Sequence, residues 1–220
     1  IDSTKLYYVE ITDKSDKYAA VENLYAGYLM FDIPLDRLRV IAGLRYEYNE
    51  QKLNGFIRQT GEPINVNHRN NDYLPSVNLT YSLNDKSNIR ISASQTVSRP
   101  ELREIAPFAF IDFTTEGQLA GNPELEESLI QNYDVRYEMF PDAGEIISLS
   151  LFYKHFNQPI EKIIVPTLQI PIPSYTFGNA KEGAVNYGLE IELRKKLGFI
   201  SRSLNNLTFN ANLSLVNSKV

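Results

Sequence analysis

Six stretches of this chain alternate apolar and polar residues with almost no exception. They are residues 77–83, 89–94, 133–139, 147–151, 187–194 and 207–215. Successive side chains of a β-strand point to opposite faces, so each stretch predicts a strand with one apolar and one polar face. An earlier hairpin is predicted with strands at 23–31 and 38–48 and a turn at 34–37, and residues 6–9 are also strand-like.

Short and long connections alternate between these predicted strands. Short turns are expected at 84–86 and 141–144, long connections at 49–73, 98–127 and 157–184, and one of intermediate length at 196–205. Outer-membrane barrels sort their connections in this way, with short turns on the periplasmic side and long loops outside the cell. Each predicted strand has about 8–11 residues, enough to cross the bilayer on a tilt. The pattern predicts an all-β protein, an antiparallel up-and-down transmembrane β-barrel segment of about 8–9 strands.

The two faces of the predicted strands differ in chemistry. Tyrosines that suit an interfacial girdle fall near the long-connection ends, at Tyr46, Tyr48, Tyr133, Tyr153 and Tyr187. The polar face carries mixed charges, and an Arg or Lys facing lipid near the midplane costs about 2–4 kcal/mol. We therefore expect this face to line a lumen, with lumen-facing residues Arg90, Asp134, Arg136, Glu138, Glu190, Glu192 and Arg194. The alternative interpretation is the solvent face of a soluble sheet.

Composition narrows the possible functions. The mean hydropathy of −0.29 by itself indicates a soluble protein, but a barrel strand presents only every second side chain to lipid. No apolar run approaches the roughly 20 residues of a membrane helix. The formal charge is −5 with no basic block, so nucleic acid is not an expected partner. The chain has no cysteine, which excludes disulfides, thiol catalysis and Cys-based zinc sites.

No catalytic pattern is present in the sequence. It contains no nucleophile elbow, no zinc-binding His-Glu-x-x-His and no phosphate loop. His68 is expected in a long connection as a solvated residue rather than a ligand or haem contact, and His155 at the end of a strand. We therefore expect no enzyme activity, no cofactor and no metal site.

Four blocks, in the right order, resemble the barrels of TonB-dependent outer-membrane receptors. The first, QTVSRPELREIAPF, contains the family's Ser-Arg-Pro strand end, and GNPEL resembles its Gly-Asn-Pro-x-Leu. NYDVRYE resembles the strand that follows, and FYKHF with PIE resembles a strand exit of the family. The blocks lie at 95–108, 121–125, 132–138, 152–156 and 159–161, within a resemblance that covers about 73–193. The sequence of residues 105–112 is most similar to the Bacteroidetes branch of this family.

The resemblance implies a bacterial outer-membrane transporter. Such a receptor has a plug domain inside a barrel of about 22 strands. It captures a scarce ligand, such as a siderophore or other iron chelate, cobalamin or a glycan, and imports it with energy coupled through TonB. The implied partners are outer-membrane lipid, the protein's own plug domain, TonB and the ligand. Residues 1–220 would then be part of the barrel domain, with the plug and the barrel's C-terminal end outside them.

Seven residues of the long connection at 98–127 are candidates for contact with ligand or plug. Pro100 ends the hydrogen-bond ladder. The charges around it, Arg99, Glu101, Arg103 and Glu104, either contact plug or ligand or brace a long loop through salt bridges. The aromatic segment 108–113 packs over the barrel mouth or against a hydrophobic ligand, and Gly-Asn-Pro is a turn former first and a ligand contact second. The candidates are Arg99, Glu101, Arg103, Phe108, Phe110, Asp112 and Asn122.

Two other functions fit the same pattern. A small self-closed eight-stranded outer-membrane barrel would act as an adhesin or structural protein, and would fold alone in detergent. A soluble β-sheet binding module would be monodisperse without detergent. An outer-membrane hydrolase ranks last, because it needs a nucleophile and a base that the sequence lacks.

Overall fold

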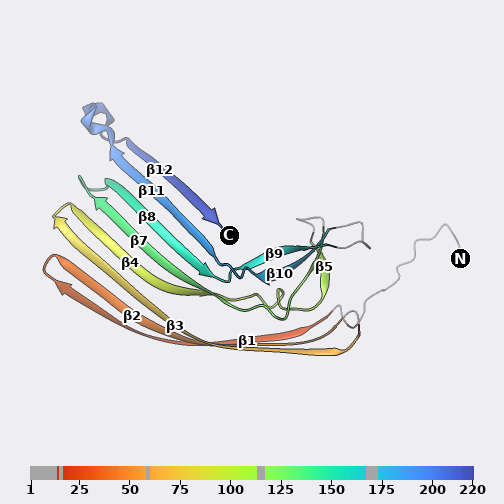
Figure 1. Ribbon diagram of the computed structural model, residues 1–220. Helices are drawn as coiled ribbons and strands as arrows, with labels where there is room; N and C mark the ends of the chain where they lie inside the picture. The colour runs from red at the N-terminus through yellow and green to blue at the C-terminus, as the bar shows by residue number, and fades with distance from the viewer. Residues whose placement is uncertain (1–13, 15–16, 58–59, 113–116, 167–172) are drawn as a thin grey trace, which may run out of the picture.

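A single curved antiparallel sheet forms most of the molecule. The structure is a computed structural model that describes residues 14, 17–57, 60–112, 117–166 and 173–220, of which 111 and 112 are described by their backbone only. Within these ranges eight strands pair in the order β1-β2-β3-β4-β7-β8-β11-β12 (Figure 1). Their bounds are β1 (Ala19–Leu35), β2 (Leu38–Phe56), β3 (Pro63–Asn84), β4 (Ser87–Ser98), β7 (Ser128–Met139), β8 (Ile146–Asn157), β11 (Ala184–Lys196) and β12 (Thr208–Lys219). The predicted all-β antiparallel fold is confirmed.

The short connections gather at one end of the sheet, as predicted (Figure 1). The turn between β1 and β2 places Asp36 at φ 48°, and the loop between β7 and β8 places Gly144 at φ 79°. Between β3 and β4, the Lys86 backbone N–H donates to Asn84 Oδ1 at 2.9 Å, the local bond that favours Asn in turns. Two short 3₁₀ turns, η2 (Leu197–Phe199) and η3 (Arg202–Leu204), join β11 to β12.

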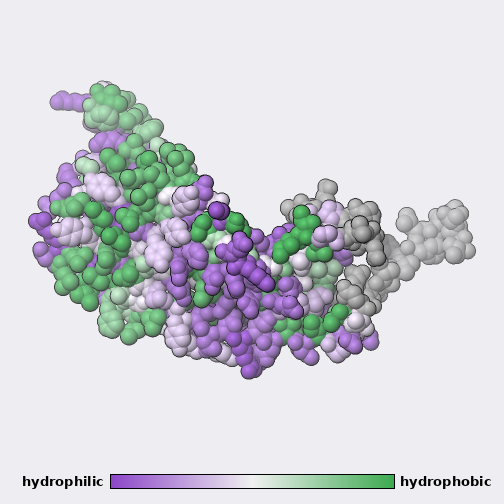
Figure 2. Space-filling view, in the orientation of Figure 1, coloured by the Kyte–Doolittle hydropathy of each residue, from purple (hydrophilic) through white to green (hydrophobic). Residues whose placement is uncertain are grey.

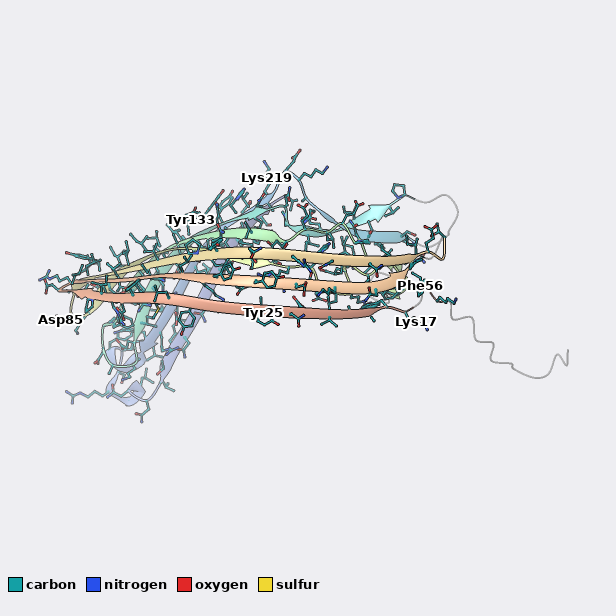
Figure 3. All side chains as sticks on the ribbon, turned by 90° about the horizontal axis from the view of Figure 1, so that it is seen from below. Lys17, Tyr25, Phe56, Asp85, Tyr133 and Lys219 are labelled. Atoms are coloured by element: carbon teal, nitrogen blue, oxygen red, sulfur yellow. The ribbon has the colours of Figure 1, made fainter. Side chains whose placement is uncertain are left out.

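The predicted long connection at 49–73 is wrong, because β2 and β3 continue through most of it. These two strands and β1 have 19, 22 and 17 residues instead of the expected 8–11. Figure 3 shows the pair running from Asp85 at one end to Phe56 at the other. Beyond Tyr48 both faces of β2 are mostly polar, so alternation vanishes from the sequence while the backbone ladder continues. Residues 6–9 lie outside the described residues.

Apolar side chains occupy one face of the sheet, as the alternation predicts. Leu149, Leu151 and Val135 are 41%, 51% and 46% exposed, values typical of surface side chains rather than of a core. Tyrosines pair across strands on this face, with ring centroids 5.2 Å apart for Tyr46 and Tyr73. Figure 2 shows apolar residues concentrated toward the short-turn end and hydrophilic ones toward the long connections. The arrangement is that of a lipid-facing band with an aromatic girdle.

A second, smaller sheet forms from the two remaining long connections. Its strands are β5 (Ala109–Asp112), β6 (Gly117–Ala120), β9 (Ile160–Val165) and β10 (Ser174–Asn179), in the order β5-β6-β10-β9. The β6–β10 pair is parallel and joins the connection after β4 to the connection after β8. The long connections are therefore one folded layer, called here the outer layer: the described residues of 99–127 and of 158–183, and the tips of β2 and β3 (Figure 1).

The small dry core of the described chain lies in this outer layer. Its buried members are Leu53 of β2, Val66 of β3, and Ile105, Ala106 and Leu125 from the connection after β4. This core packs Ile105, Ala106 and Leu125 against the face of the β2–β3 extension that carries Leu53 and Val66. Hydrophobic burial thus fixes the outer layer relative to the eight-stranded sheet, which is called the wall below. It also positions the charged residues described next.

Candidate functional site

Arg99, the residue directly after β4, lies among three carboxylates. Its guanidinium is 2.8 Å from a Glu47 carboxylate oxygen, also contacts Asp72, and is 3.5 Å from Glu127. Glu47 and Asp72 face each other in the β2–β3 register, so the two strands present a pair of carboxylates to one guanidinium. The Arg99 side chain is 14% exposed, so these ion pairs are largely shielded from water. We call Arg99, Glu47, Asp72 and Glu127 the Arg99 cluster.

Hydrogen bonds also attach the connection after β4 to β2 and β3. The Gln51 amide donates to the Pro100 carbonyl at 2.9 Å, and the Asn70 amide donates to Glu127 at 2.7 Å. A ring nitrogen of His68 lies 3.0 Å from the Pro123 carbonyl oxygen. The expectation that His68 is a solvated loop residue is wrong, because it lies in β3, half-buried, and holds the connection to the strand.

Glu127 carries the perturbed ionisation of the cluster. It precedes β7 and lies beyond the apolar band. Burial, reinforced by the neighbouring Asp72 carboxylate, raises the pKa of Glu127 to about 7, while Asn70 and Arg99 oppose the shift. Glu47 also pairs with Arg45 at 2.6 Å, whereas the only cation of the described residues that pairs with Glu127 is Arg99, at 3.5 Å. Glu127 is therefore the carboxylate that keeps its proton to the highest pH.

The other candidates of this connection have separate surroundings. The Arg103 guanidinium lies 3.6 Å above the centre of the Phe110 ring, and the Phe108 ring lies between Phe110 at 5.6 Å and Tyr18 at 5.3 Å. Glu101 is exposed, and its backbone N–H donates to the Glu104 carboxylate at 2.9 Å. Asp112 ends β5, and its side chain lies outside the described part of the structure.

Asn122 acts as a junction between backbone segments. Its side-chain amide donates to the Phe177 carbonyl of β10 at 3.0 Å and accepts from the Glu124 N–H at 2.9 Å. Its own N–H donates to the Glu104 carbonyl at 2.6 Å. The preceding Gly121 packs so closely on this backbone that a Cβ would meet the carbonyl oxygens of Ala106 and Glu104. Close packing thus accounts for glycine at position 121, and the side-chain hydrogen bonds account for asparagine at position 122.

The seven charged residues of the polar strand face lie opposite the apolar face, and five of them form an ionic network across strands. Arg90 and Arg136 both bind Glu138, at 3.0 and 2.8 Å. Arg136 also reaches Glu192 at 3.1 Å, and Arg194 lies 4.0 Å from the same carboxylate. Asp134 and Glu190 accept bonds from Ser92 and Ser214, at 3.4 and 3.5 Å. Arg90 and Arg136 face each other directly in the register, so Glu138 separates two like charges.

The sequence interpretation misses the partners of Arg99. It predicts a strand at 38–48 that contains Glu47, but it assigns Asp72 to a loop and Glu127 to an unpatterned connection. The β2–β3 pairing begins with Leu38 opposite Tyr81 at the short-turn end of the sheet, and continuing it residue by residue places Glu47 opposite Asp72. The sequence therefore contains a signal for this pair. No sequence signal links either residue to Arg99, because a folded connection of about 30 residues brings them together.

Neither metal ligation nor helical membrane insertion is evident in the described ranges. No group of three His, Asp or Glu residues among them is arranged to hold a metal ion. None of the helices in the described part of the chain is long and apolar enough to span a membrane.

A family model described as "TonB dependent receptor-like, beta-barrel" matches residues 3–219. The chain belongs to the TonB-dependent receptor β-barrel family. Members of this family are outer-membrane transport receptors of Gram-negative bacteria rather than enzymes. The predicted family and outer-membrane localisation are thereby confirmed, and the soluble binding module is set aside.

Solved receptors share the fold at low sequence identity. The siderophore receptor PirA from Pseudomonas aeruginosa is 16% identical over 91% of this chain and 44% of its own, with a TM-score of 0.62. The alcaligin receptor FauA from Bordetella pertussis is 17% identical over 92% of this chain and 31% of its own, at 0.60. The ferric citrate transporter FecA is 18% identical over 92% of this chain and 27% of its own, at 0.63. The chain thus spans less than half the length of each.

The eight-stranded sheet is open and does not close into a small barrel. Within the described residues, β1 pairs only with β2, and β12 pairs only with β11. A self-closed eight-stranded barrel needs β1 to pair with β12, so the structure contradicts that alternative.

Proposed function

We propose that this chain forms part of the wall and outer layer of a plugged receptor that captures a scarce nutrient and imports it with energy from TonB. The observation that carries the proposal is the pairing of two opposite faces on the same strands. One face is apolar and exposed, with Leu149 at 41%, and the other carries the Arg90–Glu138–Arg136–Glu192 network. Such a wall requires lipid outside and a polar interior inside.

An iron chelate is the ligand class best supported. The similar solved structures are a siderophore receptor, an alcaligin receptor and a ferric citrate transporter. Cobalamin and glycans, the other ligands of the resemblance, remain proposals without such support. We assign the first contact with ligand to the outer layer, where Glu101, Arg103, Phe108 and Phe110 lie. The inner-face charges, from Arg90 to Arg194, are assigned to contact with the plug.

The domain assignment follows the same proposal. Residues 1–220 form one part of the barrel domain, and other segments of the receptor supply the remaining strands, the plug and the TonB contact. Among the described residues β1, 17 residues long, pairs only with β2. This supports the view, since exposed strand edges recruit further strands. A Bacteroidetes origin is also proposed, because of the sequence of residues 105–112. The taxonomy of the encoding genome tests this origin.

The test is nutrient-limited growth of the native host. Deleting the gene is expected to abolish growth on a ferric chelate supplied as the sole iron source, and a plasmid copy should restore it. Deleting the host's TonB should give the same defect, whereas growth on a freely permeating nutrient should be unaffected in both strains. Normal growth of the deletion strain on every ferric chelate, cobalamin and glycan offered would refute the proposed import function.

A further inference from the structure

A cavity with a volume of ≈ 620 Å³ opens in the outer layer. One wall is the face of the small sheet that carries Ala109, Gln118, Ala120, Ser174 and Thr176. The other wall contains Ile57 and Ile64 at the tips of β2 and β3, together with Phe108. The cavity is large enough for a small organic molecule.

Strand register creates this hollow. Gln118 pairs with Ser174, and Ala120 pairs with Thr176 and with Ala109, so these side chains share one face of the sheet. They are short or flexible and do not fill the space toward Phe108. The bulky Leu119 alternates onto the other face, where it is 4% exposed. Tyr175 also lines the cavity, and its ring lies against Gly117. The cavity therefore follows from the small residues that β6 and β10 place on this face.

The lining is uncharged and contains polar groups that are not engaged. None of the described residues that line the cavity is Asp, Glu, Lys or Arg. Within the described part of the chain, the side chains of Gln118 and Ser174 have no hydrogen-bond partner. Thr176 is different, because its hydroxyl already donates to the Ala120 carbonyl at 3.1 Å. Apolar walls with a few convergent polar groups are typical of small-molecule sites.

An aromatic ring forms a fixed part of the wall. Phe108 is held between Tyr18 and Phe110, with ring centroids 5.3 and 5.6 Å away. The nearby Arg103 guanidinium lies over the Phe110 ring and is not among the residues that line the cavity. A bound anion would thus lose hydration without gaining a partner charge from the cavity wall, whereas a flat uncharged ring would gain contact with Phe108.

We propose that this cavity binds an uncharged aromatic compound that bears hydroxyl or amide groups. The aromatic ring lies against Phe108 and the apolar tips of β2 and β3, and its polar groups bond to Gln118 and Ser174. This inference goes beyond the proposed import of an iron chelate, because it names a second ligand class for the outer layer.

The test uses the full-length receptor in detergent and catechin as the probe, with binding followed by saturation-transfer NMR titration. Ala120→Leu fills the cavity and is expected to weaken catechin binding about tenfold or more. Gln118→Leu removes one hydrogen-bonding group and should weaken binding about three- to tenfold. Ala143→Leu, in the exposed β7–β8 turn on the opposite side of the membrane, is the matched control and should bind like the parent protein.

Catechin binding and import can fail independently of each other. Unchanged catechin binding by both cavity variants would overturn the inference, as would tighter binding of the anion gallate or of the sugar cellobiose. Gln118 is half-buried, so its variant remains informative if Ala120→Leu fails to fold. A receptor that binds catechin in this way but supports no import loses the proposed function and keeps the cavity site. Normal import without catechin binding overturns the cavity site and keeps the proposed function.

Discussion

The wall formed by β4, β7, β8 and β11 and the outer layer beyond it are stabilised by different forces. The wall has ladder hydrogen bonds, an apolar face turned outward and an ionic network on the other face, with hardly any buried apolar core. The outer layer has the dry core around Leu53, Ile105 and Leu125 and a shielded charge cluster. The wall therefore depends on its solvent, lipid, while the outer layer depends on its own packing. Mutations should separate these two sources of stability.

The largest effect is expected from Arg99→Met, which removes the cation shared by the three carboxylates of the Arg99 cluster and, among the described residues, leaves only Arg45 beside Glu47. Removing one partner of a buried ion pair costs about 3–5 kcal/mol. Hydrogen–deuterium exchange of the full-length receptor should show residues 99–127 opening while β7 and β8 remain protected. The matched control is Arg69→Met. Arg69 is 57% exposed and paired with Glu50, and its loss should cost about 1 kcal/mol or less. Equal exchange in the two variants would contradict a buried cluster.

The wall should be the more sensitive region when a charge is added to an apolar side chain. Leu149→Arg places a cation on the lipid face, at an expected cost of about 2–4 kcal/mol near the midplane. The amount of folded, heat-modifiable receptor in outer membranes measures this effect. Ile164→Arg in the small sheet is the control, because Ile164 is 67% exposed in the outer layer. Similar folded yields for both variants would argue that the Leu149 face does not meet lipid.

A smaller effect is expected from Gly121→Ala in the outer layer. The added methyl meets the carbonyl oxygens of Ala106 and Glu104, and overpacking of this kind costs about 1–3 kcal/mol. Limited proteolysis should cut within residues 99–127 faster than in the parent receptor. Gly27→Ala on β1 is the natural control, since no atom lies within 4 Å of its Cβ position. If the two variants are cut at the same rate, the tight junction at Gly121 is not structural.

The smallest effect concerns pH. The pKa of Glu127 is raised to about 7 by burial and by Asp72, so the folded outer layer binds this proton more tightly than the unfolded chain. Its contribution to stability is full below the ordinary carboxyl pKa of about 4.3 and is lost as the pH rises through 7. Exchange of residues 117–127, corrected for the intrinsic pH dependence of amide exchange, should show less protection at pH 8 than at pH 5.5. Glu127→Gln should remove this difference, and a variant that keeps it would exclude Glu127 as the titrating group.

Sequence patterning predicts the wall well and the outer layer poorly, for one physical reason. Alternation marks a strand only where its two faces meet different surroundings. Along β7 and β11 lipid and interior differ, so both strands are predicted and appear as expected. Past Tyr48 both faces of β2 are mostly polar, so the extension of β2 and β3 leaves no signal. For this reason the pattern puts His68 in a loop.

The candidate site shows the same division. The sequence indicates that Arg99 and Pro100 end a strand and that the connection after them carries charged and aromatic residues. It does not indicate that Glu47, Asp72 and Glu127 surround Arg99, because these residues come from separate elements. The parallel β6–β10 pair is also invisible, since strands of 4 and 6 residues carry too few positions for a pattern.

By itself, the sequence determined the strand faces, the sorting of short and long connections, the absence of a catalytic constellation and the receptor family it resembles. These are local properties, carried by residues close to one another along the chain. Only the tertiary structure decided the length of β2 and β3, the partners of Arg99, the small sheet and its cavity. Those features depend on which distant segments meet. Here the meeting is governed by burial of a few apolar residues, such as Leu53 and Ile105, whose positions in the sequence carry no period.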